Sequence, residues 1–141
     1  MMLYLDTSAV VKRYFKEQHS EEIVQYWKDA DEIATSSVAY AETLAAFYRK
    51  NREAAIGERI FRKVVSEFRR DWHSFVRVEV NDELNGFIDR VVGAHPIRGF
   101  DAIHLSSAIV LHERLPAQLL FACFDHRLSI AARAEGLRTY P

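Results

Sequence analysis

The chain has 141 residues, of which 49% are apolar, and a formal net charge of −1. These values predict one globular domain, residues 1–141, with enough chain to bury a core. The charge argues against a general polycationic nucleic-acid binder but allows a local basic surface. A single cysteine, Cys123, excludes a disulfide within the chain. We expect neither a signal peptide nor a membrane span, and therefore a cytoplasmic protein.

The hydrophobic pattern alternates short strands with helices, which predicts an α/β fold with a central parallel sheet of four or five short strands flanked by helices. The predicted helix caps are Thr7 or Ser8, Ser20, Ser36 or Ser37, and Asn81. Strands are expected up to Leu5 and over residues 32–35, 75–80, 119–124 and 137–139. Helices are expected over residues 8–15, 20–29, 37–50, 53–72, 82–93, 101–113 and 127–135.

The predicted helix over residues 53–72 is long and rich in charged residues. Four apolar residues recur in it at four-residue spacing, namely Ile56, Ile60, Val64 and Phe68. This spacing predicts one apolar stripe, which belongs either to the core or to a surface that meets a partner.

Two acids follow apolar strands. Asp6 comes directly after the first predicted strand, Asp125 comes after the strand 119–124, and a helical pattern follows each acid. Ligands of open parallel sheets bind beyond the carboxyl ends of the strands. We therefore expect Asp6 and Asp125 to share one edge of the sheet if their strands are neighbours. Either acid alone is equally explained as a turn or capping residue.

Two further acids lie on apolar helices. The neighbours of Glu42 at three and four residues include no cation; they are Val38, Ala39, Ala45 and Ala46. Because burial of an unpaired carboxylate is costly, Glu42 needs a cation from elsewhere, a proton or a metal ion, unless its helix turns it to solvent. Asp101 opens a strongly apolar helix, where its ordinary role is a favourable interaction with the helix dipole.

Four carboxylates at mixed spacing match hard divalent cations that prefer oxygen ligands, such as Mg²⁺ or Mn²⁺. Zinc is not expected, because the six histidines contain no pair at four-residue spacing and Cys123 has no cysteine partner.

The order of these motifs resembles that of the PIN-domain family. The resemblance rests on Leu5–Ala9, on Ser36 or Ser37 with Glu42, on Asp101–Ala108 and on Phe124–Leu128, and it extends along essentially the whole chain. The length and the single-domain layout are similar to those of the toxin of a VapBC-type toxin–antitoxin pair.

The resemblance implies a PIN fold and Mg²⁺- or Mn²⁺-dependent hydrolysis of RNA by metal-activated water, with 5′-phosphate and 3′-hydroxyl products. The catalytic and metal-binding residues that it implies are Asp6, Glu42, Asp101 and Asp125, the last as a ligand or as an orienting group. Ser8 matches a hydroxyl that the family places beside the metal. The resemblance further implies a homodimer and a small antitoxin whose tail covers the active site. The segment 53–75 and His126 match no motif of the family.

An RNA backbone requires cations near the acids. Four basic residues lie close in sequence to Asp6 or Asp101 and are our RNA-binding candidates: Lys12, Arg13, Lys16 and Arg98. Taken singly, each is better explained as part of an ordinary solvated face. His104 is expected to form a buried structural hydrogen bond rather than to act as a general base, because it lies inside an apolar helix.

Three other functions remain open at this point. A PIN nuclease of RNA maturation or of DNA structures would use the same acids, and a neighbouring reading frame for a small antitoxin would separate it from a toxin. A PIN-like nucleic-acid-binding module with a dead site is disfavoured, because all four acid positions are filled. A phosphotransferase with an aspartyl nucleophile would need a second Asp two residues after Asp6, where Ser8 stands.

Overall fold

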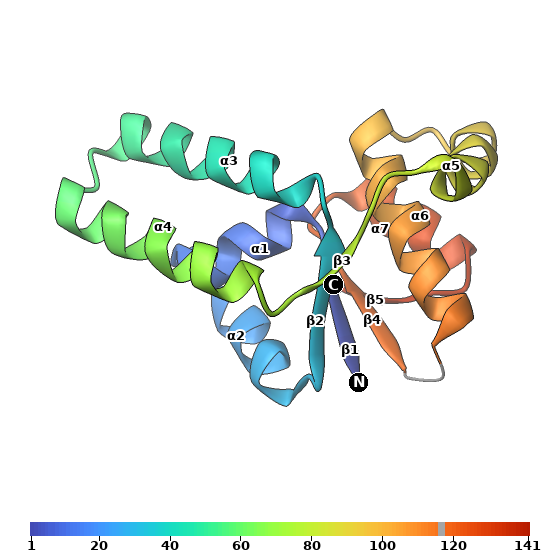
Figure 1. Ribbon diagram of the computed structural model, residues 1–141, viewed down its shortest axis with the longest axis horizontal. Coiled ribbons are helices and arrows are strands. Elements are labelled where there is room, and N and C mark those ends of the chain that lie inside the picture. The colour runs from blue at the N-terminus through green and yellow to red at the C-terminus, as the bar shows by residue number, and fades with distance from the viewer. Residues whose placement is uncertain (116–117) are drawn as a thin grey trace.

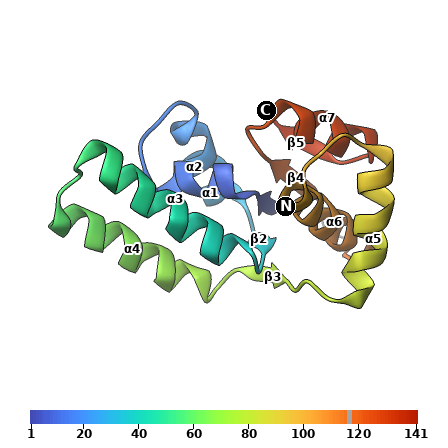
Figure 2. The same ribbon diagram turned by 90° about the horizontal axis from the view of Figure 1, so that it is seen from above.

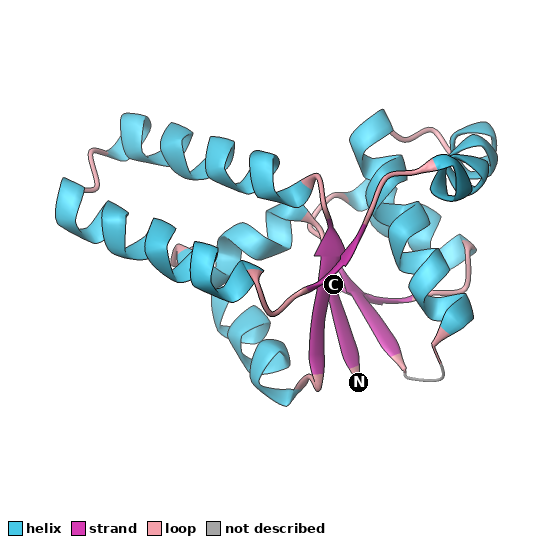
Figure 3. Cartoon of the chain, in the orientation of Figure 1, coloured by secondary structure: helices cyan, strands magenta, loops and turns pink. Residues whose placement is uncertain are grey.

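The computed structural model describes residues 1–115 and 118–141. Its centre is a five-stranded sheet in the order β3-β2-β1-β4-β5, in which every neighbouring pair of strands is parallel (Figure 1, Figure 3). The strands are β1 (Met2–Leu5), β2 (Glu32–Ser36), β3 (Val76–Val78), β4 (Leu119–Ala122) and β5 (Arg138–Tyr140). The predicted α/β fold with a parallel sheet is confirmed.

Helices cover both faces of the sheet: α1 (Thr7–Tyr14), α2 (Ser20–Asp29), α3 (Ala39–Ala54), α4 (Glu58–Trp72), α5 (Asp82–Ala94), α6 (Gly99–Arg114) and α7 (His126–Ala134). In Figure 2, α1 to α4 lie on one side and α5 to α7 on the other. Because successive side chains of a strand point to opposite faces, Leu3 and Leu5 pack with Phe47, whereas Tyr4 packs with Leu105. No helix within the described residues is long and apolar enough to span a bilayer.

The predicted single helix over residues 53–72 is wrong. The α3 helix continues to Ala54, and the chain then turns through Ala55 (φ 47°) and Gly57 (φ 97°) before α4 begins. Both φ values are left-handed, which ends a helix, and glycine adopts this conformation without a steric penalty. The two helices form a hairpin that projects away from the sheet (Figure 1).

The predicted stripe on this segment does not form one surface, because Ile60 is 60% exposed whereas Phe68 is fully buried. The side chains of α4 that are buried in the core are Phe61, Val65, Phe68 and Trp72. A residue advances about 100° around a helix, so each four-residue step overshoots a full turn by about 40°. The buried face therefore alternates four-residue and three-residue steps, which a strict four-residue pattern does not follow.

Asn81 caps α5 as predicted, because its side chain accepts a hydrogen bond from the Leu84 amide at 3.0 Å. The other predicted caps are wrong. Asp6 caps α1 in place of Thr7 or Ser8, and α3 begins after Val38 without a side-chain cap. Ser20 lies inside α2, where its hydroxyl ties down the preceding loop by donating to the Phe15 carbonyl and accepting from the Glu17 amide.

Candidate active site

The carboxyl ends of β1 and β4 meet at one edge of the sheet. The Asp6 amide donates to the Ala122 carbonyl at 3.1 Å, and the chain turns into α1 after Asp6 and into α7 after Asp125. The first turns of α3 and α6 carry Glu42 and Asp101. Contacts between these elements, described below, bring all four predicted acids to this edge.

Asp6 is the most enclosed of these acids, with 5% of its surface exposed. Its Oδ1 accepts from Ser8 Oγ at 2.6 Å and from a backbone amide of α1 at 3.0 Å. Ser8 Oγ also accepts from the Phe124 amide at 3.1 Å, which ties the ends of β1 and β4 together. Burial raises the pKa of Asp6 to about 6, although His104 and the hydrogen bonds lower it, and the Asp101 charge adds to the increase. Asp6 is therefore a carboxylate in need of positive charge.

A chain of side-chain hydrogen bonds holds Glu42. Its Oε1 accepts from Thr7 Oγ1 at 2.7 Å and lies 2.9 Å from His104 Nε2, while His104 Nδ1 lies 2.9 Å from the Tyr4 hydroxyl. Burial raises the pKa of Tyr4 well above its ordinary value, so the hydroxyl keeps its proton. Because a charged carboxylate can only accept, His104 carries a proton on Nε2 and donates it to Glu42.

These donors decide the charge of Glu42. Burial acts to raise the pKa of Glu42, but the hydrogen bonds from His104 and Thr7 outweigh it, and the pKa falls below its ordinary value. We call Tyr4, Thr7, His104 and Glu42 the Glu42 network. It fixes one oxygen of a charged carboxylate at the edge of the sheet.

Asp101 and Asp125 form the more open part of the site, with side chains 24% and 37% exposed. Arg98, which is 86% exposed, places guanidinium nitrogens 3.8 Å from Asp101 Oδ2 and 3.9 Å from Asp125 Oδ2. Asp125 also caps α7 by accepting from the Leu128 amide at 2.9 Å. Burial raises the pKa of Asp101, and the Asp125 charge raises it further, while Arg98 opposes both.

Carboxylates that raise one another's pKa form a donor set that fits a hard divalent cation such as Mg²⁺ or Mn²⁺. Within residues 1–115 and 118–141, however, no three His, Cys, Asp or Glu side chains stand close enough to hold an ion as they are placed. Binding would therefore require carboxylates of the open part to rotate toward Asp6. The carboxylate oxygens suit a divalent cation, but as they are placed they do not surround one.

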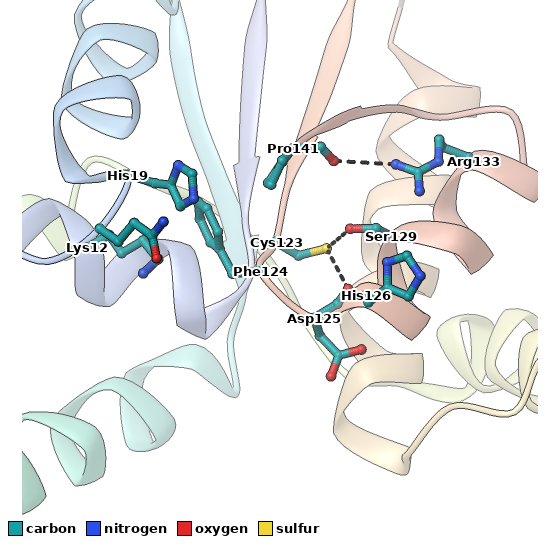
Figure 4. A pocket seen from close by; sticks show the side chains of 10 residues that line it. Lys12, His19, Cys123, Phe124, Asp125, His126, Ser129, Arg133 and Pro141 are labelled. Atoms are coloured by element: carbon teal, nitrogen blue, oxygen red, sulfur yellow. Dashed lines mark hydrogen bonds between the residues drawn. The ribbon is translucent and has the colours of Figure 1, made fainter.

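Two hollows flank Asp125. The first, which we call the Phe124 hollow, has a volume of about 500 Å³, and its lining includes Lys12, His19, Phe124, Asp125, His126 and Arg133 (Figure 4). The second, the Arg98 hollow, has a volume of about 540 Å³ and contains Arg98, Asp101, Asp125 and His126. Asp125 thus stands between two recesses that can accept the chain of a polymer.

The predicted RNA-binding residues fall into two groups. Lys12 lines the Phe124 hollow and Arg98 lines the hollow named after it. Arg13 instead lies against the aromatic rings of Tyr14 and Trp27, with its guanidinium carbon 5.2 Å from each ring centroid. Lys16 is exposed in the segment after α1. The role of these residues in RNA binding stays a prediction.

His104 is 2% exposed and hydrogen-bonded, as predicted. Two of its neighbours, Tyr4 and Thr7, were not predicted as members of the site. A usable signal was present for Tyr4, because a tyrosine in a short, fully buried strand needs a partner for its hydroxyl. No local pattern identifies Thr7, since its partner Glu42 is 35 residues away in sequence.

Comparison with known proteins agrees with this architecture. The family model described as PIN domain matches residues 3–134. The sequence is 31% identical to Ribonuclease VapC49 of Mycobacterium tuberculosis over 144 residues, covering 99% of this chain and 95% of that protein. It is 28% identical to Ribonuclease VapC46 of the same organism, covering 96% of this chain and 93% of that protein.

Two solved structures share the fold. One is VapBC2 from Rickettsia felis bound to a DNA fragment from its promoter, with a TM-score of 0.67, 13% identity and coverage of 99% of this chain and 98% of that chain. The other is VapC20 of Mycobacterium tuberculosis, described as a Sarcin-Ricin loop cleaving toxin, with a TM-score of 0.62, 19% identity and coverage of 92% and 94%.

The chain belongs to the PIN-domain family. Within that family, the full-length similarity assigns it to the VapC ribonucleases. The resemblance predicted from the order of the sequence motifs is confirmed.

Proposed function

We propose that this protein is a divalent-cation-dependent endoribonuclease that acts as the toxin of a toxin–antitoxin pair. The observation that carries the proposal is the gathering of Asp6, Glu42, Asp101 and Asp125 at one edge of the sheet, with the pKa values of Asp6 and Asp101 raised. In a VapC-family chain, oxygen ligands that are short of positive charge support a Mg²⁺ or Mn²⁺ site.

In this mechanism Asp6, Glu42 and Asp101 would hold one or two ions, and Asp125 would be a further ligand or orient one. A bound ion would supply activation of water and neutralisation of charge on the phosphoryl group. Ser8 holds the Asp6 carboxylate, and His104 holds that of Glu42, so neither has to reorganise as charge develops during the reaction.

Arg98 stands at the open side of the acids, where its exposed guanidinium can attract an RNA phosphate. Water adds its oxygen to phosphorus while the bond from phosphorus to the 3′ oxygen breaks, and the departing oxygen takes up a proton. The products then carry a 5′-phosphate and a 3′-hydroxyl.

The test is cleavage of a mixed RNA pool by the purified protein with Mg²⁺ or Mn²⁺. We expect Asp101→Asn to lower the rate roughly 10²- to 10³-fold, as when one preorganised electrostatic group is lost, and EDTA to abolish cleavage. Asp82→Asn is the matched control, because Asp82 is an exposed acid in the first turn of another helix. Cleavage that survives Asp101→Asn or EDTA would contradict the proposal.

We also propose that the protein works in the cytoplasm as a homodimer and is inhibited by a small antitoxin that covers the acids. A solved structure of similar fold from Klebsiella pneumoniae, described as a toxin–antitoxin complex, supports the antitoxin part of this proposal. Co-expression with the product of a neighbouring small reading frame should yield a stable complex without RNA cleavage. Light scattering of the protein alone should give the mass of two chains. Unchanged cleavage in the presence of the co-expressed product, or the mass of one chain, would count against these two statements.

A further inference from the structure

The Phe124 hollow opens beside the acids but has no part in the mechanism above. It shares Asp125 and His126 with the Arg98 hollow, so the two recesses meet at Asp125. A polymer whose scissile phosphate lies at the acids would extend from one recess into the other. Small-molecule sites have volumes of roughly 300–1,000 Å³, so the Phe124 hollow, at about 500 Å³, has room for a nucleotide and is much larger than a metal ion needs.

One wall of this hollow is a stack of rings. The rings of His19 and Phe124 lie with their centroids 5.4 Å apart and their planes at 25° (Figure 4), and Tyr140 meets both edge-on. His19 has a left-handed backbone conformation, with φ 71°, at the start of α2. This conformation is uncommon for residues other than glycine, although histidine adopts it more often than most, and residues that hold it gather at functional sites.

The hollow also carries positive charge. Lys12 Nζ lies 4.6 Å from the centroid of the Phe124 ring, and hydrogen bonds to the carboxyl-terminal segment hold the guanidinium of Arg133 at another wall. Lys12 shares its charge with Glu17, which also pairs with a second lysine, so that group keeps one net positive charge. Asp125 is the only acidic side chain among the described residues that line the hollow.

We propose that the Phe124 hollow binds one unpaired nucleotide of the RNA, next to the phosphodiester bond that is cut. The base stacks against the rings of His19 and Phe124, and its phosphate meets Lys12 and Arg133. Stacking on aromatic side chains is the usual way in which proteins hold bases of single-stranded RNA. The inference rests on the proposed ribonuclease function and adds to it a binding site for one base beside the bond that is cut.

The first experiment does not depend on cleavage. The wild-type protein is titrated in EDTA with each nucleoside 5′-monophosphate, and in a separate arm with inorganic phosphate, while amide NMR signals are recorded. We expect shifts at His19, Phe124 and Arg133 with the nucleotides that phosphate alone does not reproduce. Equal shifts with phosphate would show that the hollow binds only an anion. No shift in the hollow would show that it does not bind a nucleotide. Either result would overturn the proposal.

The second experiment measures the affinity of a labelled single-stranded RNA for Asp101→Asn protein, with and without His19→Ala or Phe124→Leu. Each additional change should weaken binding roughly 5- to 100-fold, the range that loss of one base stack produces. His112→Ala, an exposed change at the far end of α6, is the matched control and should leave affinity unchanged. Thermal melts verify that the variants fold.

The two proposals fail in different ways. If wild-type protein cuts RNA in a metal-dependent manner but His19→Ala and Phe124→Leu bind and cut as wild type does, the nucleotide site is overturned and the ribonuclease stands. Equal cleavage of a duplex and of its separate single strands would also overturn the site. If nucleotides bind in the hollow but no RNA is cut, the ribonuclease proposal fails instead.

Discussion

Glu42 and Asp101 invite a direct comparison. Both lie in the first turn of a helix at the same edge of the sheet, and their side chains are similarly exposed, 27% and 24%. Their pKa values nevertheless shift in opposite directions. Glu42 meets two strong donors, from His104 and Thr7, and its pKa is lowered. Burial raises the pKa of Asp101, the Asp125 charge adds to the increase, and the distant, exposed Arg98 does not offset them.

Burial alone therefore does not decide the charge of an acid at this site. The protein stabilises the charge of Glu42 with its own hydrogen bonds, on what we call the closed side. It leaves Asp6 and Asp101 in need of a cation from outside, and we call these two acids the open side in this sense, although the Asp6 side chain is itself enclosed. We therefore propose that the metal binds nearer to Asp6 and Asp101 than to Glu42 Oε1. That oxygen already accepts hydrogen bonds from Thr7 and His104.

The largest effect is predicted on the open side. Asp6→Asn keeps an oxygen that can cap α1 but removes the charge, so the protein should fold while cleavage falls roughly 10²- to 10³-fold. Cleavage rates at saturating Mn²⁺ measure the effect, with circular dichroism to verify the fold. A rate within a few-fold of wild type would mean that the open side does not carry the reaction.

A smaller loss is predicted when the closed side is opened. His104→Ala removes the donor that orients Glu42, and loss of such a supporting partner typically costs about 10- to 100-fold in activity or metal affinity. The pKa of Glu42, followed by carbon NMR of its carboxyl group, should rise and so resemble that of Asp101. Tyr4→Phe removes only the more distant hydroxyl and should have a weaker effect of the same kind. An unchanged Glu42 pKa in His104→Ala would contradict the claim that the hydrogen bond from His104 sets Glu42 apart from Asp101.

The open side should also make stability depend on pH in the absence of metal. The pKa of Asp6 in the folded protein, about 6, lies above its ordinary value of 3.8, so the folded state binds more protons between these values. The free energy of unfolding should therefore decrease as pH rises from about 4 to about 6, by at most roughly 3 kcal/mol from this group, since one pKa unit corresponds to about 1.4 kcal/mol.

Urea unfolding in EDTA at pH 4 and at pH 7 measures this dependence. Asp6→Asn should remove most of the decrease, and added Mn²⁺ should reverse it at pH 7. The lowered pKa of Glu42 acts in the opposite sense, because its stabilisation is present above the unfolded pKa and is lost as pH falls. If the stability of Asp6→Asn and of wild type depended on pH in the same way, the pKa of Asp6 would not be raised in the folded protein.

The smallest effect is predicted for Arg98→Ala. Arg98 is 86% exposed and its contacts to the acids are long, so stability should change by less than about 0.5 kcal/mol. Removal of one phosphate contact should weaken RNA binding by a few-fold and reduce its salt slope by about 0.7, the value for single-stranded nucleic acid. Fluorescence anisotropy at several salt concentrations measures both. Lys63→Ala, an exposed change on the distant hairpin, serves as the control.

Local sequence patterns predicted the open side better than the closed side. Asp6 and Asp125 follow buried strands, and parallel neighbours bring strand ends to one edge, so their meeting follows from the fold class. The absence of a helical cation near Glu42 correctly indicated a partner from elsewhere. That partner could not be identified, because His104 is 62 residues away and its orientation depends on Tyr4 in the central strand.

The errors in the fold have a similar cause. One long helix over residues 53–72 agreed with composition, but the left-handed turn at Ala55 and Gly57 divides the segment into parts of two helices. The choice of Phe61 over Ile60 as a core residue depends on how α4 packs against its neighbours, which the spacing of apolar residues alone does not fix.

The most direct test of the account is a titration with Mn²⁺ followed by amide NMR, because this paramagnetic ion broadens the signals of nearby groups. We predict that the first equivalent broadens the signals of Asp6, Ser8 and Asp101 before others, and that Asp6→Asn abolishes this broadening. Broadening centred on other exposed acids, such as those at the start of α5, or equal broadening in Asp6→Asn, would contradict a cation site on the open side.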